Sequence, residues 1–159
     1  MVKSLSPSAQ RVQSALDDFG LSLEVVELPD STRTAVEAAN AVGCHVGQIV
    51  KSLVFKAKRS KRPILVLASG ANRVNEKKIE AQIGEPLGKA NADFVRQHTG
   101  FSIGGVSPVG HIKSIETFID VDLLKYKEVW AAAGTPNAVF RVDPNEFEKI
   151  VEGELVDIK

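Results

Sequence analysis

One lysine lies where its side chain could do chemistry. Residues 49–55 read Ile-Val-Lys-Ser-Leu-Val-Phe, and this apolar, β-branched run predicts a strand over Ile49–Ala57. Because side chains alternate along a strand, Lys51 shares one face with Ile49, Leu53 and Phe55. Both faces are largely apolar, so the strand is expected to be central and covered on both sides. The pattern therefore directs Lys51 toward an interior or a pocket wall.

A lysine in such a place has few stable arrangements. Burying an ammonium is costly unless its pKa falls or an oxygen pairs with it. A carboxylate, a phosphate or a substrate oxygen would serve, which makes Lys51 a candidate ligand-binding residue. Two structural interpretations stay open beside this one. The side chain could extend past the strand edge to water, or it could pair with an acid such as Asp120.

A glycine-rich segment is the second candidate. Residues 104–110 read Gly-Gly-Val-Ser-Pro-Val-Gly, and glycines let backbone N–H groups approach a carboxylate, a phosphate or an oxyanion. The segment lacks the Gly-Lys-Ser/Thr ending of a P-loop and the spacing of a dinucleotide fingerprint. It could equally be a tight connection. A small-residue turn at 132–137 could leave room for a ligand beside the sheet or be a plain hairpin turn.

Weaker signals come from other polar residues. One basic cluster could meet RNA phosphates, or could be a solvated hairpin tip: Lys56, Lys58, Arg59, Lys61 and Arg62. The three histidines show no metal-ligand spacing, and only His111 borders the glycine segment. Cys44 is expected to be a small buried hydrophobe.

Composition limits the classes of protein that remain. In the 159 residues, 20 basic residues balance 20 acidic ones, so RNA contact must come from a local patch. The single cysteine excludes an intrachain disulfide and a multi-cysteine zinc site. No apolar run resembles a signal peptide or the roughly 20 residues that span a bilayer. The cytosol is the expected compartment.

Helix and strand signals mix without strict alternation, which predicts one α/β (α+β) domain over residues 1–159, with a mixed central sheet and flanking helices. A break is expected at 29–31, and Thr34 and Glu37 form a capping box. Helices are expected from Ser6 to Gly20, Thr34 to Gly43, Asn75 to Gly84, Asn91 to Gly100 and Pro144 to Val151. The other strands are expected at 21–28, 64–69, 115–119, 129–133, 138–142 and 155–158.

Four motifs in this order resemble one family. They are Thr-Ala-Val-Glu-Ala-Ala at 34–39, Gln-Ile-Val-Lys-Ser-Leu-Val-Phe at 48–55, the glycine segment at 104–110, and Ala133-Gly134. Together they resemble the YbaK/ProX editing domains, relatives of the editing insertion in bacterial prolyl-tRNA synthetases. The resemblance runs from about Ser6 to Ile158, and the ordered set is far more specific than any one motif.

The resemblance implies a barrel-like mixed sheet and hydrolysis of misacylated tRNA in trans, with no metal or organic cofactor. It implies that Lys51 is the functional lysine and that the acceptor end of aminoacyl-tRNA is the partner. A synthetase partner and the oligomeric state stay open. The candidate substrate-binding residues are Thr34, Ser52, Gly104, Gly105, Val106, Pro108, Gly110, His111, Ala133 and Gly134.

One departure bears on the substrate. Cysteine-specific members usually carry Ser-Ala-Gly where this chain has Ala132-Ala133-Gly134. The expected substrate is therefore a small amino acid such as alanine on tRNA(Pro). Three alternatives stay open: a Cys-tRNA(Pro) deacylase that uses the substrate thiol, a non-catalytic tRNA-binding or interaction module, and a small-molecule protein that binds an anion at Lys51.

Overall fold

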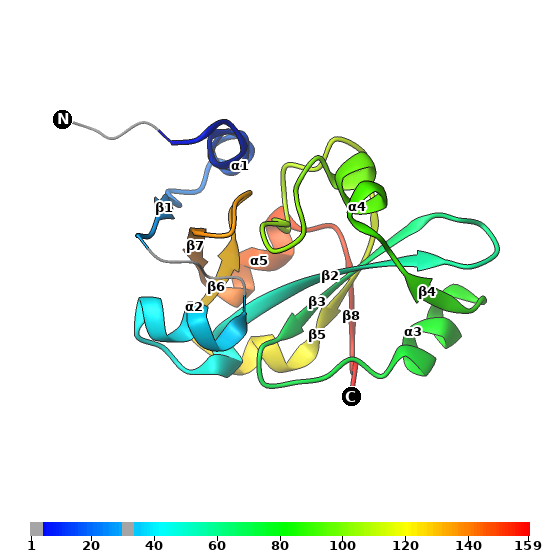
Figure 1. The fold of residues 1–159 in the computed structure, drawn as a ribbon. Coiled ribbons are helices and arrows are strands. Elements are labelled where there is room, and N and C mark those ends of the chain that lie inside the picture. Colours follow the sequence, from blue (N-terminus) through cyan, green and yellow to red (C-terminus); the bar gives the residue numbers. More distant parts are fainter. Residues whose placement is uncertain (1–4, 30–33) are drawn as a thin grey trace.

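The computed structural model describes residues 5–29 and 34–159 and contains one mixed eight-stranded sheet with helices around it (Figure 1). The strand order is β1-β7-β6-β2-β3-β5-β8, and β4 also pairs with β2. The strands are β1 Val25–Glu27, β2 Ile49–Ala57, β3 Pro63–Ser69, β4 Leu87–Lys89, β5 Glu116–Asp120, β6 Val129–Ala132, β7 Ala138–Val142 and β8 Glu154–Val156. The helices are α1 Pro7–Asp18, α2 Ala35–Val42, α3 Glu76–Ile83, α4 Ala92–Thr99 and α5 Pro144–Ile150, with 3₁₀ helices η1 Val46–Gln48 and η2 Val121–Lys125.

The hairpin of β2 and β3 runs through the middle of the molecule (Figure 1). The two strands pair antiparallel from Val50↔Ser69 to Lys56↔Pro63. Their side chains alternate between two apolar clusters. Val50 and Leu65 belong to one cluster, and Ile64 and Val66 belong to the other. The expected central strand, covered on both faces, is confirmed.

The other edge of β2 is only partly covered. β6 runs parallel to β2 and pairs with Ile49 and Val50, whereas β4 runs antiparallel and pairs from Phe55 to Ala57. Residues 51–54 lie between these two strands. Within the described part of the chain, no strand pairs with them on this edge. We call this gap the β2 window.

Capping residues set the helix ends where the sequence predicts them. The side chains of Thr34, Asn75 and Asn91 accept hydrogen bonds from backbone N–H groups in the first turns of α2, α3 and α4. Glycines in the left-handed conformation follow each of these helices. α1 ends slightly before the expected Gly20: its last residue is Asp18, and Phe19 lies after the helix and is 46% exposed.

Short elements escaped the sequence patterns. β4 contains only three residues, with a glycine in the middle, and is held by its pairing with β2. The first strand is shorter than expected: it spans Val25–Glu27 instead of residues 21–28. The expected break at 29–31 falls partly outside the described residues. The mixed α/β fold with flanking helices is confirmed, and the domain boundaries at 1 and 159 stay a prediction.

We predict that Gly134 is needed for packing whatever its other roles. It has a φ of +96°, and a Cβ there would lie 2.6 Å from the carbonyl oxygen of Ser8 in α1. Gly134→Ala should therefore lower the free energy of unfolding by about 2–4 kcal/mol. Gly84→Ala is the matched control, since Gly84 also has a positive φ but no atom within 4 Å. It should cost only about 1 kcal/mol. Urea denaturation checks this, and equal losses would contradict it.

Candidate functional site

A cavity of about 380 Å³ opens at the β2 window. Three parts of the chain that are distant in sequence meet there: the start of α2, the middle of β2, and the glycine segment. The end of β6 closes one side. We call this cavity the Lys51 cleft. It is lined by Thr34, Ala35, Ile49, Val50, Lys51, Ser52, Leu53, Ile103, Gly104, Val106 and Ala132.

A second cavity of about 180 Å³ continues the cleft toward β4 and α4. The two share five lining residues, among them Ser52, Ile103 and Gly104, so they form one groove along β2 under the glycine segment. The added walls are mainly apolar, including Phe55 and Val95. An apolar groove with a few polar groups is typical of small-ligand sites.

The backbone of β2 faces the groove at the window. The N–H of Ala57 donates to Arg62 on the β3 side, and the N–H of Lys58 donates to Pro86 on the β4 side. Because successive residues of a strand turn their N–H and C=O groups to opposite edges, Ser52 and Val54 direct theirs toward the window. No strand takes these groups up along 51–54 in the described chain. The window therefore offers donors and acceptors to an extended ligand.

The Ser52 hydroxyl adds to these groups. Its oxygen is buried and has no hydrogen-bond partner among the described residues. A buried polar atom without a partner costs free energy, so such an atom calls for an explanation. Ser52 lines both parts of the groove, and a ligand there would supply the missing hydrogen bond.

Lys51 is half-buried at the wall of the cleft. Its ammonium donates a hydrogen bond to the main-chain oxygen of Asn72, at 2.5 Å. Burial lowers the pKa of Lys51, and the negative charge of Asp120 opposes this effect. Lys51 therefore lines a cavity, whereas the alternative of an ion pair with Asp120 is not formed among the described residues: Asp120 acts on Lys51 only through its field.

The glycine segment is fixed from below. Phe101, Val106, Ser107 and Val109 are buried, and the side-chain oxygen of Thr99 accepts the N–H of Phe101 at 3.0 Å. Ile103, at the tip, is 56% exposed and lines the cleft. The segment therefore packs against the core and lies over β2, with the apolar side chain of Ile103 exposed at its edge.

The structure brings together only part of the predicted site. Thr34, Lys51, Ser52, Gly104 and Val106 line the cleft, whereas Ala133 and Gly134 are buried beyond it. Gly105 lies against the backbone of Thr135, where a Cβ would come within 2.8 Å. The roles of all these residues toward a substrate stay predictions.

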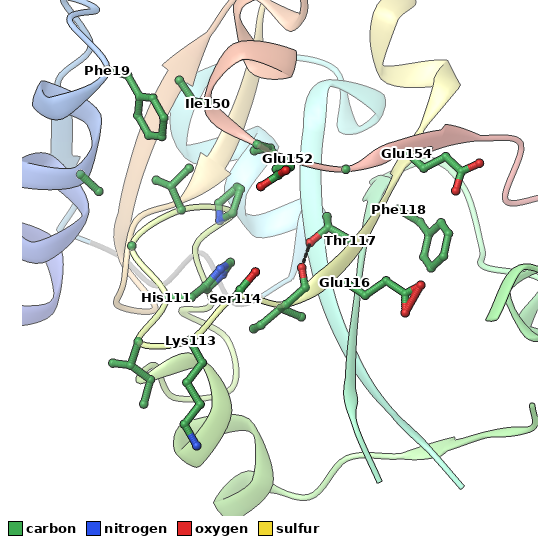
Figure 2. A pocket seen from close by; sticks show the side chains of 18 of the residues that line it. Phe19, His111, Lys113, Ser114, Glu116, Thr117, Phe118, Ile150, Glu152 and Glu154 are labelled. Atoms are coloured by element: carbon green, nitrogen blue, oxygen red, sulfur yellow. Dashed lines mark hydrogen bonds between the residues drawn. The ribbon is translucent and has the colours of Figure 1, made fainter. Parts of the chain in front are cut away.

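Pro108, Gly110 and His111 line a different cavity of about 850 Å³ between the segment, β5 and the chain after α5. Figure 2 shows this cavity, with His111 and Ser114 on one wall and Glu152 and Glu154 on the opposite one. The His111 ring lies 2.6 Å from the Ser107 oxygen, and burial lowers its pKa. His111 therefore holds the glycine segment from the side away from the cleft.

The basic cluster is divided by its contacts. Lys58, Arg59 and Lys61 are exposed in the β2–β3 turn, whereas Arg62 forms ion pairs with Glu85 and Glu116. Lys56 lies with its ammonium 5.1 Å from the center of the Phe94 ring on α4. Three cations at the tip are thus free of ion pairs in the described chain, and both interpretations of the cluster remain.

In the described chain, no group of three or more His, Cys, Asp or Glu residues could hold a metal ion. Cys44 was expected to be buried but is only half-buried; it packs against the cluster of Ala38, Ala39 and Ile49, and burial raises its pKa. No described helix has the length and hydropathy needed to cross a membrane.

Sequence patterns missed two contributors to the cleft. Ala35 is a small residue at the start of α2, and it is recognized as a lining residue only once α2 meets β2, whereas Ala132 belongs to the small-residue turn that was expected to leave room for a ligand. Asn72 follows the turn after β3 and reaches Lys51 through its main chain, which no side-chain motif reveals.

Comparison with known proteins decides the family. The sequence model of the aminoacyl-tRNA editing domain matches residues 29–150. The chain belongs to this family. The predicted enzyme class, an aminoacyl-tRNA deacylase, is confirmed with it.

Individual relatives agree with this editing domain. A solved structure of a candidate trans-editing enzyme for prolyl-tRNA synthetase is 53% identical, with a TM-score of 0.92, over 98% of this chain and 99% of that one. The proline–tRNA ligase of Limosilactobacillus fermentum is 27% identical over 92% of this chain, which spans 29% of the ligase. The candidate Cys-tRNA(Pro)/Cys-tRNA(Cys) deacylase EbsC of Enterococcus faecalis is 22% identical over 79% of this chain and 76% of its own length.

We predict that His111 makes stability depend on pH. Its pKa is lowered in the folded state by burial, and the Arg11 charge adds to this effect. Below the unfolded pKa of about 6.5, the unfolded chain therefore binds a proton that the folded chain does not, and stability falls as pH drops. His111→Gln should remove this part of the slope. Urea midpoints between pH 7.5 and 5 check it, and parallel curves for the two proteins would contradict it.

Proposed function

We propose that the chain acts in trans on mischarged tRNA and hydrolyses the ester of a small amino acid, such as alanine, on tRNA(Pro). The observation that carries the proposal is the Lys51 cleft, where a lysine, an unpartnered hydroxyl and an uncovered strand edge meet in one cavity. The likeness to a candidate trans-editing enzyme for prolyl-tRNA synthetase supports the choice of tRNA.

The cleft has complementary groups for the aminoacyl end. An aminoacyl ester carries an ammonium, a carbonyl and a ribose, which need acceptors and donors at short range. In the proposal, the backbone groups of Ser52 and Val54 and the N–H groups around Gly104 orient the aminoacyl group. Lys51 holds the ester oxygen or the phosphate of the terminal adenosine. Fixed donors of this kind stabilise the negative charge that develops on the carbonyl oxygen.

Water is the proposed nucleophile. Its oxygen bonds to the ester carbon, and the bond to the ribose oxygen then breaks. One water proton passes to the ribose oxygen, which becomes a hydroxyl, and the other passes to solvent, leaving the free amino acid as a carboxylate and the uncharged tRNA end. No side-chain nucleophile is required for this sequence.

The small residues that line the cleft determine which substrate side chains fit. Ala132 and Ala35 line the cleft, so a short substrate side chain fits between β6 and α2. Exclusion by size discriminates about 1–3 kcal/mol per methylene, so related small amino acids are expected to be accepted to different degrees.

Cysteine is the second candidate substrate. The likeness to a candidate Cys-tRNA(Pro)/Cys-tRNA(Cys) deacylase favours it, and there the substrate thiol could attack its own ester. Ala132 argues against it, because the cysteine-specific pattern has a serine at this position and Ala132 provides no hydroxyl to the cleft.

The tRNA body would contact the molecule outside the cleft. Lys58, Arg59 and Lys61 at the hairpin tip are the proposed phosphate contacts. The cytosol, where charged tRNA is present, remains the expected compartment. The proposed reaction neither requires nor excludes a synthetase partner.

The test is deacylation of labelled alanyl-, seryl-, cysteinyl- and prolyl-tRNA(Pro). We predict hydrolysis of alanyl-tRNA(Pro) and a loss of about 100-fold in kcat/KM for Lys51→Ala, since Lys51 contacts the reacting end. Lys149→Ala is the control for charge alone, because Lys149 is exposed on α5 and lines neither part of the groove; it should retain activity within about threefold. Activity on cysteinyl-tRNA only would favour the substrate thiol, and full activity of folded Lys51→Ala would refute the role of the lysine.

A further inference from the structure

Among the described residues, no carboxylate forms an ion pair with Lys51. Its ammonium donates a hydrogen bond to the main-chain oxygen of Asn72. A neutral carbonyl on a loop is a weak anchor for a cation unless the loop itself is fixed. The position of this carbonyl therefore decides where the ammonium lies in the cleft.

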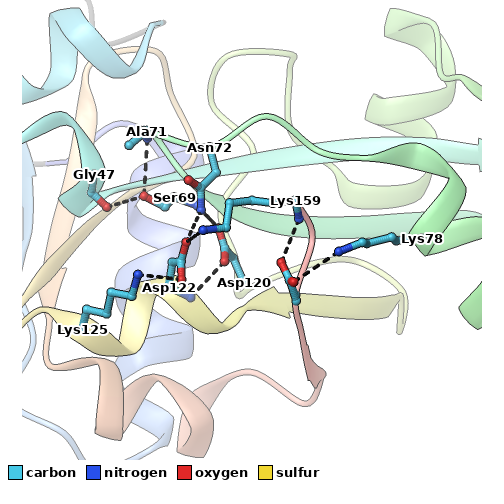
Figure 3. Close-up of polar contacts among 10 residues, drawn as sticks. Gly47, Ser69, Ala71, Asn72, Lys78, Asp120, Asp122, Lys125 and Lys159 are labelled. Carbon is cyan, nitrogen blue, oxygen red and sulfur yellow. Dashed lines mark hydrogen bonds and ion pairs between the residues drawn. The ribbon is translucent and has the colours of Figure 1, made fainter.

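The Asn72 side chain fixes that loop. Its amide nitrogen donates to Asp120 Oδ2 and to Asp122 Oδ2, both at 2.8 Å, and its own backbone N–H donates to Ser69 at 2.9 Å (Figure 3). Three hydrogen bonds thus tie Asn72 to the end of β3, the end of β5 and the start of η2. Hydrogen bonds to charged acceptors are stronger than neutral ones.

Asp120 is the center of this network. It is 1% exposed, and its carboxylate accepts hydrogen bonds from the Ser69 N–H, the Asn72 amide and the Asp122 N–H. No ion pair to Asp120 occurs among the described residues. Three N–H donors therefore hold this buried carboxylate in one place.

Asp122 differs from Asp120 in this respect. Lys125 and Lys159 both form ion pairs with Asp122, at 3.0 and 2.9 Å, and these contacts lower its pKa (Figure 3). Its negative charge is compensated locally. Asp120 therefore supplies the net negative field that Lys51 experiences across Asn72.

We propose that Asn72 and Asp120 are positioning residues for Lys51: Asp120 fixes the Asn72 loop, and the Asn72 carbonyl holds the lysine ammonium at the wall of the cleft. This inference rests on the proposed function for its catalytic consequence, but the placement of the ammonium follows from the contacts alone. Neither residue touches the cleft. They act on the substrate only through Lys51.

Two variants and one control separate the parts of this network. Asn72→Ala removes both side-chain hydrogen bonds and leaves the Asp120 charge in place. Asp120→Asn removes the charge and keeps the shape. Asp157→Asn is the matched control. Asp157 is an exposed carboxylate near the C-terminus; it pairs with Lys78 and does not contact Asn72.

A double-mutant cycle measures the coupling to Lys51. Asn72→Ala should lower kcat/KM about tenfold in the wild-type background and less than about twofold in the Lys51→Ala background. A merely structural role would cost the same in both backgrounds. Equal losses would therefore overturn the proposal.

A spectroscopic measurement tests the placement without any substrate. The charge that acts on Lys51 is that of Asp120, whereas Asp122 is paired with Lys125 and Lys159; on the α2 side, Thr34 and Ala35 line the cleft. Titration of the Lys51 ammonium by NMR should show a lower pKa in folded Asp120→Asn than in the wild type, and no change in Asp157→Asn. An unchanged Lys51 pKa in Asp120→Asn would contradict the role of Asp120.

The two readouts fail separately. Wild-type protein that hydrolyses no ester would refute the proposed function, while the titration would still decide the placement of the ammonium. If Asp120→Asn does not fold, Asn72→Ala keeps the test in place. Its Lys51 ammonium signal should then broaden through faster exchange, and a signal as sharp as in the wild type would count against the proposal.

Discussion

The candidate site depends on an incomplete strand pairing. Along one edge, β3 pairs with β2 from Val50 to Lys56. Along the other edge, the pairing of β2 with β6 ends at Val50 and its pairing with β4 begins at Phe55. A central strand normally loses its backbone donors and acceptors to its neighbours. Here four residues keep one edge unpaired in the middle of the sheet, so a ligand can meet backbone that β3 holds on its other side. The glycine segment and α2 then form the walls of this opening.

Two opposing effects act on the charge of Lys51 at this partly buried position. Partial burial lowers its pKa, and the field of Asp120 works in the opposite direction. Asp120 in turn needs no cation in contact, since three N–H groups satisfy its oxygens. The lysine is thus stabilised without being neutralised by a direct ion pair, and its ammonium remains available to a phosphate or an ester oxygen.

Local rules predicted much of this arrangement. The alternation of residues 49–55 identified β2 and the unusual lysine, and cap residues fixed the ends of α2, α3 and α4. The window itself could not be read from the sequence, because it results from where β6 and β4 stop along β2. Ala35, too, was recognized as a lining residue only in the fold. The glycine segment was identified as one unit, but packing divides it: Gly104 and Val106 line the cleft, while Pro108 and His111 face another cavity.

The central claim is that the aminoacyl end binds at the β2 window. NMR titration with a non-hydrolysable alanyl-adenosine analogue tests it most directly, since backbone amide shifts report which cavity is filled. The largest shifts are expected at Ser52, Val54 and Gly104. Shifts centered on the larger cavity, at Lys113, Glu116 and Glu152, with Ser52 and Val54 unmoved, would contradict the account.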